Sequence, residues 1–207
     1  MSVAGQLYVI TAPSGTGKTT IIRRLLGQLE NVDFSVSHTT RAPREREVPG
    51  RDYFFVSEAE FKSMVESGAF VEWARVHGNY YGTSKFMINQ SLEQGRDLLL
   101  DIDIQGAINI KRHYPEAVYI MFAPPSFHEL KARLTGRGSE APESLRLRLA
   151  NARHEIESFK EFNYMIINQD VDRALVETLS IFTAERLRVS QCASKIEDLL
   201  LHWDEVI

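Results

Sequence analysis

The stretch Ala12-Pro13-Ser14-Gly15-Thr16-Gly17-Lys18-Thr19 decides the fold, because it joins an apolar run at Gln6–Thr11 to a helical pattern from Lys18 to about Leu29. The run predicts a strand, and the apolar spacing predicts a helix. Small loop residues let backbone N–H groups point at a polyphosphate, a lysine reaches its β and γ oxygens, and a hydroxyl suits Mg²⁺. We interpret the stretch as a phosphate-binding loop. The alternative is an ordinary Gly/Ser turn with a solvated lysine.

One position departs from the G-x-x-x-x-G-K-[ST] pattern of such loops, since Ala12 stands where the first glycine is expected. Alanine is unstrained at negative φ but is strained by roughly 1 kcal/mol at positive φ. The sequence leaves open which of these conformations Ala12 adopts.

The bulk composition limits the classes of protein. A chain of 207 residues, 43% of them hydrophobic, buries roughly 70% of its unfolded surface, which predicts one or two folding units. The net charge of −4 argues against a nucleic-acid partner. The single cysteine, Cys192, fits a reducing compartment, and the apolar run near the start is too short for a signal peptide or membrane span. We therefore expect a cytoplasmic protein with no membrane partner.

Further short apolar runs recur between helical patterns, at Phe34–Ser37, Asp97–Ile102, Ala117–Phe122 and Tyr164–Asn168. This alternation predicts an α/β fold with a parallel sheet that helices cover on both faces. Ligands of such sheets bind beyond the carboxyl ends of the strands. Residues 38–83 interrupt the alternation and are interpreted as a small inserted subdomain.

Two motifs in that insert carry polar chemistry. Residues 38–51 contain four arginines and two prolines, and form either a solvated charged loop or a clamp in which Arg41 and Arg44 bind a second phosphate through their guanidinium groups. Glu72 lies in a largely apolar strand predicted at Phe70–Val76. It is either on the exposed face or a buried acceptor for a ligand N–H. Residues 77–82 are predicted to form a turn.

Asp101 and Asp103 lie at the end of the strand predicted at Asp97–Ile102. Residues two apart point to the same side of an extended chain, so these carboxylates are candidates for one shared site. Asp101 has the position of the strand-end carboxylate near Mg²⁺ in phosphate-loop enzymes. Asp103 is alternatively a cap of the helix predicted at Ile104–His113.

The second half of the chain offers a candidate lid. Residues 135–142 are polar, and Arg137 stands between two glycines, which predicts either a mobile lid over a nucleotide or an ordinary helix connection. A long helix at about 143–159 carries Arg148. A helix at Val171–Val189 is expected to bury Leu175, Leu179, Phe182 and Leu187. The tail beyond it has an apolar helical stripe, which predicts a docking helix.

Taken together, these motifs closely resemble the guanylate kinase family over about residues 5–188. The segments that carry the resemblance are Ser14–Thr19, Ser37–Arg44, Gly50–Tyr53, Glu72-Trp73, Gly78–Gly82, Asp101–Gly106 and Gly136–Gly138. The resemblance implies a phosphate-loop α/β core (5–37, 84–134 and 151–188), a GMP-binding subdomain (38–83) and a lid (135–150). Residues 189–207 form a helical tail outside it.

The resemblance also implies a function: transfer of the γ-phosphoryl group of ATP to GMP, with Mg²⁺ as cofactor, in guanine nucleotide metabolism. It implies ATP binding by Ala12, Pro13, Ser14, Gly15, Thr16, Gly17, Lys18, Thr19, Arg137 and Asn168. It implies GMP binding by Ser37, Arg41, Arg44, Tyr53, Glu72, Tyr81, Thr83 and Asp103. Thr19 and Asp101 would serve Mg²⁺, partly through water. Catalytic roles would fall to Lys18, Arg41, Arg137, Arg148 and Asp101.

Two rival functions share the fold. A guanylate-kinase-like interaction module would bind phosphopeptides without catalysis, but it would not need Lys18-Thr19 together with Asp101. A kinase for another small phosphate acceptor is the second rival, and Glu72 with Ser37 favours guanine over it. The sequence leaves a homo-oligomer open.

Overall fold

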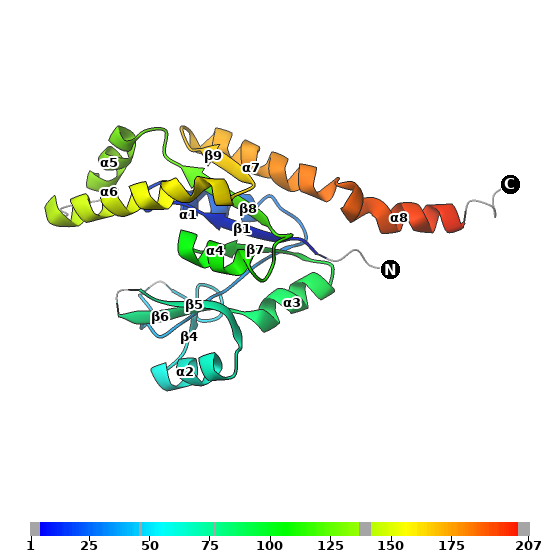
Figure 1. The fold of residues 1–207 in the computed structure, drawn as a ribbon, viewed down its shortest axis with the longest axis horizontal. Helices are drawn as coiled ribbons and strands as arrows, with labels where there is room; N and C mark the ends of the chain where they lie inside the picture. Colours follow the sequence, from blue (N-terminus) through cyan, green and yellow to red (C-terminus); the bar gives the residue numbers. More distant parts are fainter. Residues whose placement is uncertain (1–4, 46, 77, 137–141, 203–207) are drawn as a thin grey trace.

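The computed structural model describes residues 5–45, 47–76, 78–136 and 142–202. A five-stranded parallel sheet forms its centre (Figure 1). In spatial order the strands are β2 (Val32–Phe34), β7 (Asp97–Asp101), β1 (Leu7–Thr11), β8 (Val118–Ala123) and β9 (Tyr164–Ile167). Every residue of β1 and β8 is buried, as expected for parallel strands covered on both faces. The predicted α/β fold with a parallel sheet is confirmed.

Helices cover both faces of this sheet, because consecutive side chains of a strand point to opposite sides. The helices are α1 (Lys18–Leu26) and α7 (Val171–Arg186) on one face, and α3 (Lys85–Glu93) and α4 (Ile104–Lys111) on the other. From β1, Tyr8 and Ile10 enter the first cluster, whereas Leu7 and Val9 enter the second. The sheet is therefore sandwiched between two separate apolar layers.

The predicted strand at Phe34–Ser37 is wrong in position, since β2 ends at Phe34. Ser35 still donates its N–H to the Leu99 carbonyl at 2.9 Å, but the chain then leaves this sheet. It enters β3 (His38–Thr39) of a second sheet. Apolar alternation does not locate such an exit, because Val36 is buried even outside a strand.

The second sheet has the order β4 (Phe54–Phe55), β3 (His38–Thr39), β6 (Asn79–Ser84) and β5 (Phe70–Val76). Helix α2 (Glu58–Glu66) packs beside it, where the buried ring of Phe61 stacks on Phe70 and Tyr80. Ser57 and Glu60 form a capping box at the start of α2. These elements form the lower part of the molecule in Figure 1.

The turn predicted at residues 77–82 is confirmed at Gly78 and is wrong for residues 79–82. Asn79–Ser84 forms β6, which pairs antiparallel with both β5 and β3. Asparagine and glycine are unfavourable in strands. Pairing on both sides overrides that preference here, so the two tyrosines of this segment lie in a sheet.

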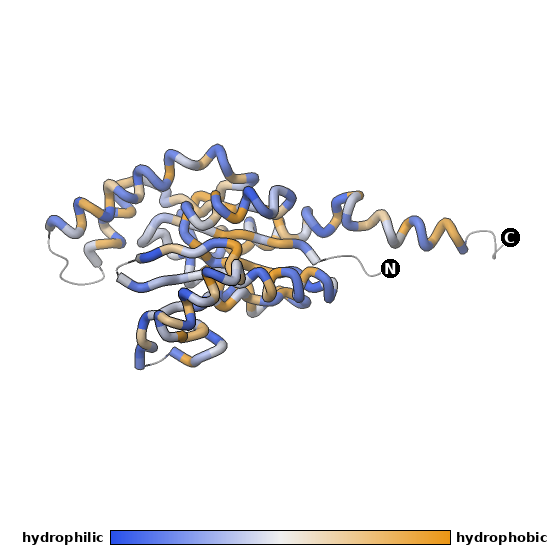
Figure 2. Tube along the Cα trace, turned by 60° about the horizontal axis from the view of Figure 1, so that its bottom comes forward, coloured by the Kyte–Doolittle hydropathy of each residue, from blue (hydrophilic) through white to orange (hydrophobic). Residues whose placement is uncertain are grey.

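The remaining helices are α5 (Phe127–Thr135), α6 (Pro142–Glu157), the 3₁₀-helix η1 (Ser158–Glu161) and α8 (Val189–Leu201). The expected burial of Leu187 is wrong: α7 ends at Arg186, and Leu187 is 71% exposed. Helix α8 extends away from the body (Figures 1 and 2), and Ile196, Leu199 and Leu200 are more than half exposed. The expected docking of its stripe is not seen within the described residues. No described helix is both long and apolar enough to cross a membrane.

Candidate active site

The loop between β1 and α1 has the backbone shape that a phosphate requires. Gly15 and Gly17 have φ values of 88° and 94°, where an L side chain is strained. A Cβ on Gly15 would also lie 2.7 Å from Leu134 Cδ2. Among the described residues other than glycine, only Asn31 has a positive φ. Ala12 is therefore unstrained, which settles the question that its sequence raised.

Lys18 points into the site rather than into solvent. Its Nζ lies 2.5 Å from Asp101 Oδ1 and donates to the Ile102 carbonyl at 3.1 Å. The side chains of Lys18 and Asp101 are only 19% and 25% exposed. The alternative of a solvated lysine is thereby excluded, and the lysine and the strand-end carboxylate are brought together as predicted.

Arg133, which the sequence analysis missed, and Asn168 support this loop from beneath. Asn168 is 1% exposed, and its Nδ2 donates to the Thr16 carbonyl at 2.6 Å. Arg133 donates to the same carbonyl at 3.4 Å and to the Asn168 carbonyl at 3.2 Å. The side-chain amide of Asn168 thus donates to the loop backbone, and its implied role at the adenine stays a prediction. The sequence around Arg133 did not indicate this role, because a glutamate four residues earlier is an ordinary helical ion-pair partner for an arginine.

Helix α6 contributes two charged residues to the same site. Arg148 Nη2 donates to Ser14 Oγ at 2.6 Å, so the predicted Arg148 meets the loop. Glu155, two turns further along the helix, lines the loop cavity together with Lys18. Burial, followed by the charge of Asp103, raises the pKa of Glu155. Sequence reasoning missed Glu155, whereas Arg137 lies outside the described residues.

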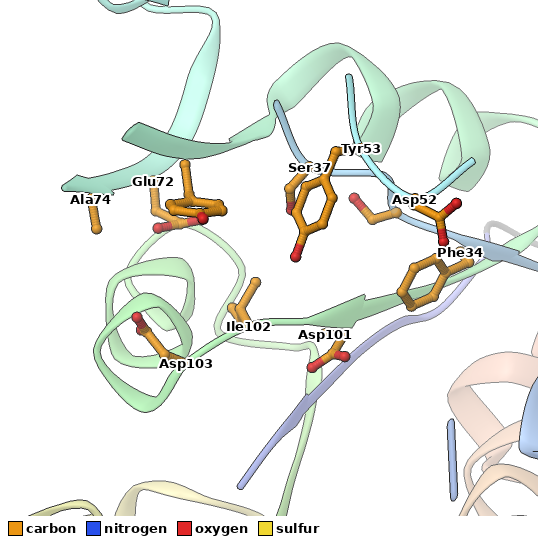
Figure 3. A pocket seen from close by; sticks show the side chains of 11 residues that line it. Phe34, Ser37, Asp52, Tyr53, Glu72, Ala74, Asp101, Ile102 and Asp103 are labelled. Atoms are coloured by element: carbon orange, nitrogen blue, oxygen red, sulfur yellow. The ribbon is translucent and has the colours of Figure 1, made fainter. Parts of the chain in front are cut away.

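A second cavity adjoins the loop cavity (Figure 3). Five of the predicted GMP-binding residues line it: Ser37, Tyr53, Glu72, Tyr81 and Asp103. Tyr53, Asp101, Ile102 and Asp103 line both cavities. The two cavities therefore meet at the carboxyl end of β7. The interpretation of Asp103 as a helix cap is confirmed, because it accepts the Gly106 N–H at 2.7 Å at the start of α4, while its implied role in GMP binding stays a prediction.

Glu72 faces this second cavity, so the interpretation as an exposed strand residue is wrong. The register of β5 against β6 shifts between Phe70 and Glu72, and such bulges redirect side chains near sites. Thr83, directly opposite on β6, donates its hydroxyl to Glu72 Oε1 at 2.7 Å. Burial raises the pKa of Glu72, and the Thr83 bond partly offsets that rise. Glu72 is a half-buried acceptor that lines the second cavity.

Within residues 38–51, Glu47 holds the two arginines of the predicted phosphate clamp, and the sequence analysis missed it. Arg41 Nη2 donates to both oxygens of Glu47, at 2.7 and 2.9 Å, and the Arg44 N–H donates to Glu47 Oε2 at 2.8 Å. The Arg41 guanidinium also lies 5.4 Å from the centre of the Tyr53 ring. The hydrogen bond to Glu47 raises the pKa of Arg41. Arg41 is only 16% exposed, so it is not simply solvated, although its partner here is a carboxylate of its own loop.

These features define a class. A phosphate loop on a parallel sheet faces a carboxylate on the neighbouring strand and opens into a second cavity lined by carboxylates and tyrosines. Such a site belongs to a phosphate-loop kinase that accepts a second, smaller phosphorylated ligand.

Comparison with known proteins identifies the family. The guanylate kinase family profile matches residues 4–185. Guanylate kinases of Thermotoga maritima and Neisseria gonorrhoeae are 46% and 47% identical over 193 and 196 residues, which cover 93% and 95% of this chain and 93% and 96% of theirs. The crystal structure of guanylate kinase from Anaplasma phagocytophilum has a TM-score of 0.75 at 32% identity, covering 92% of this chain and 90% of that one. The chain belongs to the guanylate kinase family.

Proposed function

We propose that this ATP:GMP phosphotransferase binds ATP in the loop cavity and GMP in the adjoining cavity, and transfers the γ-phosphoryl group where the two meet. The observation that carries the proposal is the set of residues common to both cavities, which includes Tyr53, Asp101 and Asp103. Two nucleotides bound with their phosphates toward these residues would face each other.

The donor half rests on Lys18 and the loop backbone. Lys18 would exchange its bond to Asp101 for the β and γ oxygens of ATP, and Arg148 already lies beside Ser14 at the loop. Arg137 is proposed to join it from the lid segment 135–150. Thr19 and Asp101 fit Mg²⁺, because a hydroxyl and a carboxylate line the same cavity and hard oxygen donors are the ligands that this ion prefers. Mg²⁺ bound there would neutralise charge on the β and γ phosphates.

The acceptor half rests on the second sheet. Glu72, supported by Thr83, would accept the N1–H and N2–H of guanine, with Ser37 and Asp103 beside the base. Arg41, Arg44, Tyr53 and Tyr81 would hold the GMP phosphate. Arginine suits this task because its planar group donates two parallel bonds to phosphate.

Catalysis in this arrangement is positioning and charge neutralisation. The attacking phosphate oxygen of GMP is already ionised at neutral pH, so no general base is needed. Lys18, Arg41 and Arg148 would surround the charge that develops during an in-line transfer. We further propose a cytoplasmic role in guanine nucleotide metabolism, which the cysteine content favours.

A coupled assay of the purified protein with ATP and a panel of nucleoside monophosphates tests the proposal. We expect GMP to be preferred over AMP by about 10⁴-fold or more in kcat/KM, because adenine would leave the Glu72 charge desolvated and unpaired. IMP should be intermediate, since it keeps N1–H but lacks the amino group. Equal turnover of AMP and GMP would refute the assignment of the second cavity.

A further inference from the structure

Gly106, in the first turn of α4, is a glycine whose backbone does not require one. It is helical, has no positive φ, and is buried. Alanine is intrinsically better than glycine inside a helix. The reason for a glycine must therefore be space rather than backbone freedom.

The space at Gly106 is occupied by the base-reading carboxylate. A Cβ built on Gly106 would lie 3.3 Å from Glu72 Oε2 and 3.5 Å from Glu72 Cδ. The 3.3 Å contact with Oε2 is tighter than most real Cβ contacts, so that oxygen would have to move by a few tenths of an ångström, whereas the contact with Cδ is an ordinary one. The same Cβ would lie 3.2 Å from Asp103 Oδ1, which is the cap of this helix.

Glu72 has little freedom to accommodate that movement. Its other oxygen, Oε1, accepts the hydroxyl of Thr83 at 2.7 Å, and Thr83 is 1% exposed. Its backbone is fixed at the bulge of β5, where Val71 packs in the same buried cluster as Ala107 and Ile110 of α4. Figure 3 shows the Glu72 carboxylate on the strand side of the cavity and Asp103 at the end of α4 on the other. A methyl group at position 106 would turn Glu72 away from α4 or stretch its bond to Thr83.

We propose that Gly106 is a specificity-determining positioning residue, which leaves the space that lets Glu72 meet both N–H donors of guanine. The inference rests on the proposed function, in which Glu72 reads the base. Gly106 itself touches no reacting atom and acts through Glu72.

The test is Gly106→Ala in the full chain, with Gly27→Ala as the matched control. Gly27 also has an unstrained φ, of −75°, and an added Cβ there would find its nearest neighbour at 3.4 Å, an ordinary contact far from the site. A misplacement of 1 Å costs roughly 100-fold, so a shift of a few tenths should raise the KM for GMP about 4- to 10-fold. The KM for ATP should stay within about twofold, and the melting temperature should not fall, because alanine favours the helix.

Two further readouts separate positioning from a general structural defect. IMP has one donor fewer, so it should lose less than GMP, and the GMP/IMP preference should fall. In a Glu72→Gln background, Gly106→Ala should have little additional effect on GMP, because the group through which it acts has already been changed. Additive effects of the two substitutions would overturn the proposal.

The outcomes distinguish this inference from the proposed function. If the wild-type protein does not prefer GMP, the function itself is wrong. If the wild-type protein prefers GMP while Gly106→Ala leaves both the KM for GMP and the GMP/IMP ratio unchanged, only the role of Gly106 is refuted. A larger rise in the KM for ATP than in the KM for GMP would also refute it.

Discussion

Replacing Glu72 by glutamine removes one charge from the acceptor cavity while keeping the shape of the side chain. In the structure, the Thr83 hydroxyl donates to Glu72 Oε1 at 2.7 Å. The amide oxygen of the new side chain would take over that role, since Thr83 offers a donor. Its NH₂ group would then face the guanine N–H groups, so a donor meets donors.

The magnitude follows from that exchange. Hydrogen bonds to a charged acceptor are worth about 1.5–3 kcal/mol, against about 0.5–1.5 kcal/mol for neutral pairs, and an unmatched buried donor adds its own desolvation cost. We expect Glu72→Gln to cost about 2–4 kcal/mol in kcat/KM for GMP, which is roughly 30- to 1000-fold. IMP should lose less, because it presents only one of the two donors.

The assay is steady-state kinetics with GMP, IMP and AMP at saturating ATP. Glu66→Gln is the matched control, because it makes the same chemical change at an exposed residue, at the end of α2 in the same part of the molecule. The control should behave as the wild type. An unchanged GMP/AMP ratio in Glu72→Gln would show that another residue reads the base.

Three further predictions concern the charges of the site. Lys18→Ala should abolish nearly all transfer while GMP binding, measured by calorimetry, stays within a few fold, because Lys18 lines the loop cavity and not the second cavity; unchanged turnover would refute the loop assignment. Glu47→Gln should raise the KM for GMP by about 2- to 12-fold, because Arg41 would lose the carboxylate that holds it and would have to be ordered when GMP binds. A lower KM would show instead that Glu47 competes with the GMP phosphate for Arg41. Because burial raises the pKa of Glu72, kcat/KM for GMP should fall as the pH drops through that raised pKa, and this fall should be absent in Glu72→Gln. The free energy of unfolding should change in the opposite direction, because a carboxyl group with a raised pKa in the folded state makes that state less stable as the pH rises above the pKa of the unfolded chain. The variant should therefore melt no lower than the wild type at pH 7.

The sequence predicted the parts of the site that local spacing controls. The loop and its lysine follow from a strand, a turn and a helix in direct succession, and Asp101 follows from its place at the end of a separate apolar strand. The cap Asp103 was predicted for the same reason, because a cap and its partner are three residues apart.

Contacts between distant segments could not be predicted in this way. Asn168 reaches Thr16 from 152 residues away, and Arg133 reaches it from 117. Glu47 lies only six residues from Arg41, yet its pattern is equally that of a solvated loop. The β6 strand was missed because Asn79 and Gly82 have poor strand propensity, and the segment becomes a strand where β3 and β5 flank it.

Two chain connections join the second sheet to the central sheet, and their positions bear on how GMP would be held. The chain passes from the central sheet into this one through Ser35–Ser37, and returns where Ser84 ends β6 and caps α3. Ser37 and Thr83 thus lie at the two crossing points, whereas Arg41 and Arg44 lie beyond them. In a rotation about these connections, residues close to them would move least. A purine bound there would stay near the rotation axis, whereas the phosphate of the same nucleotide would move further. If the second sheet rotates about these connections when the nucleotides bind, labels placed at position 44 should report larger distance changes than labels at position 86.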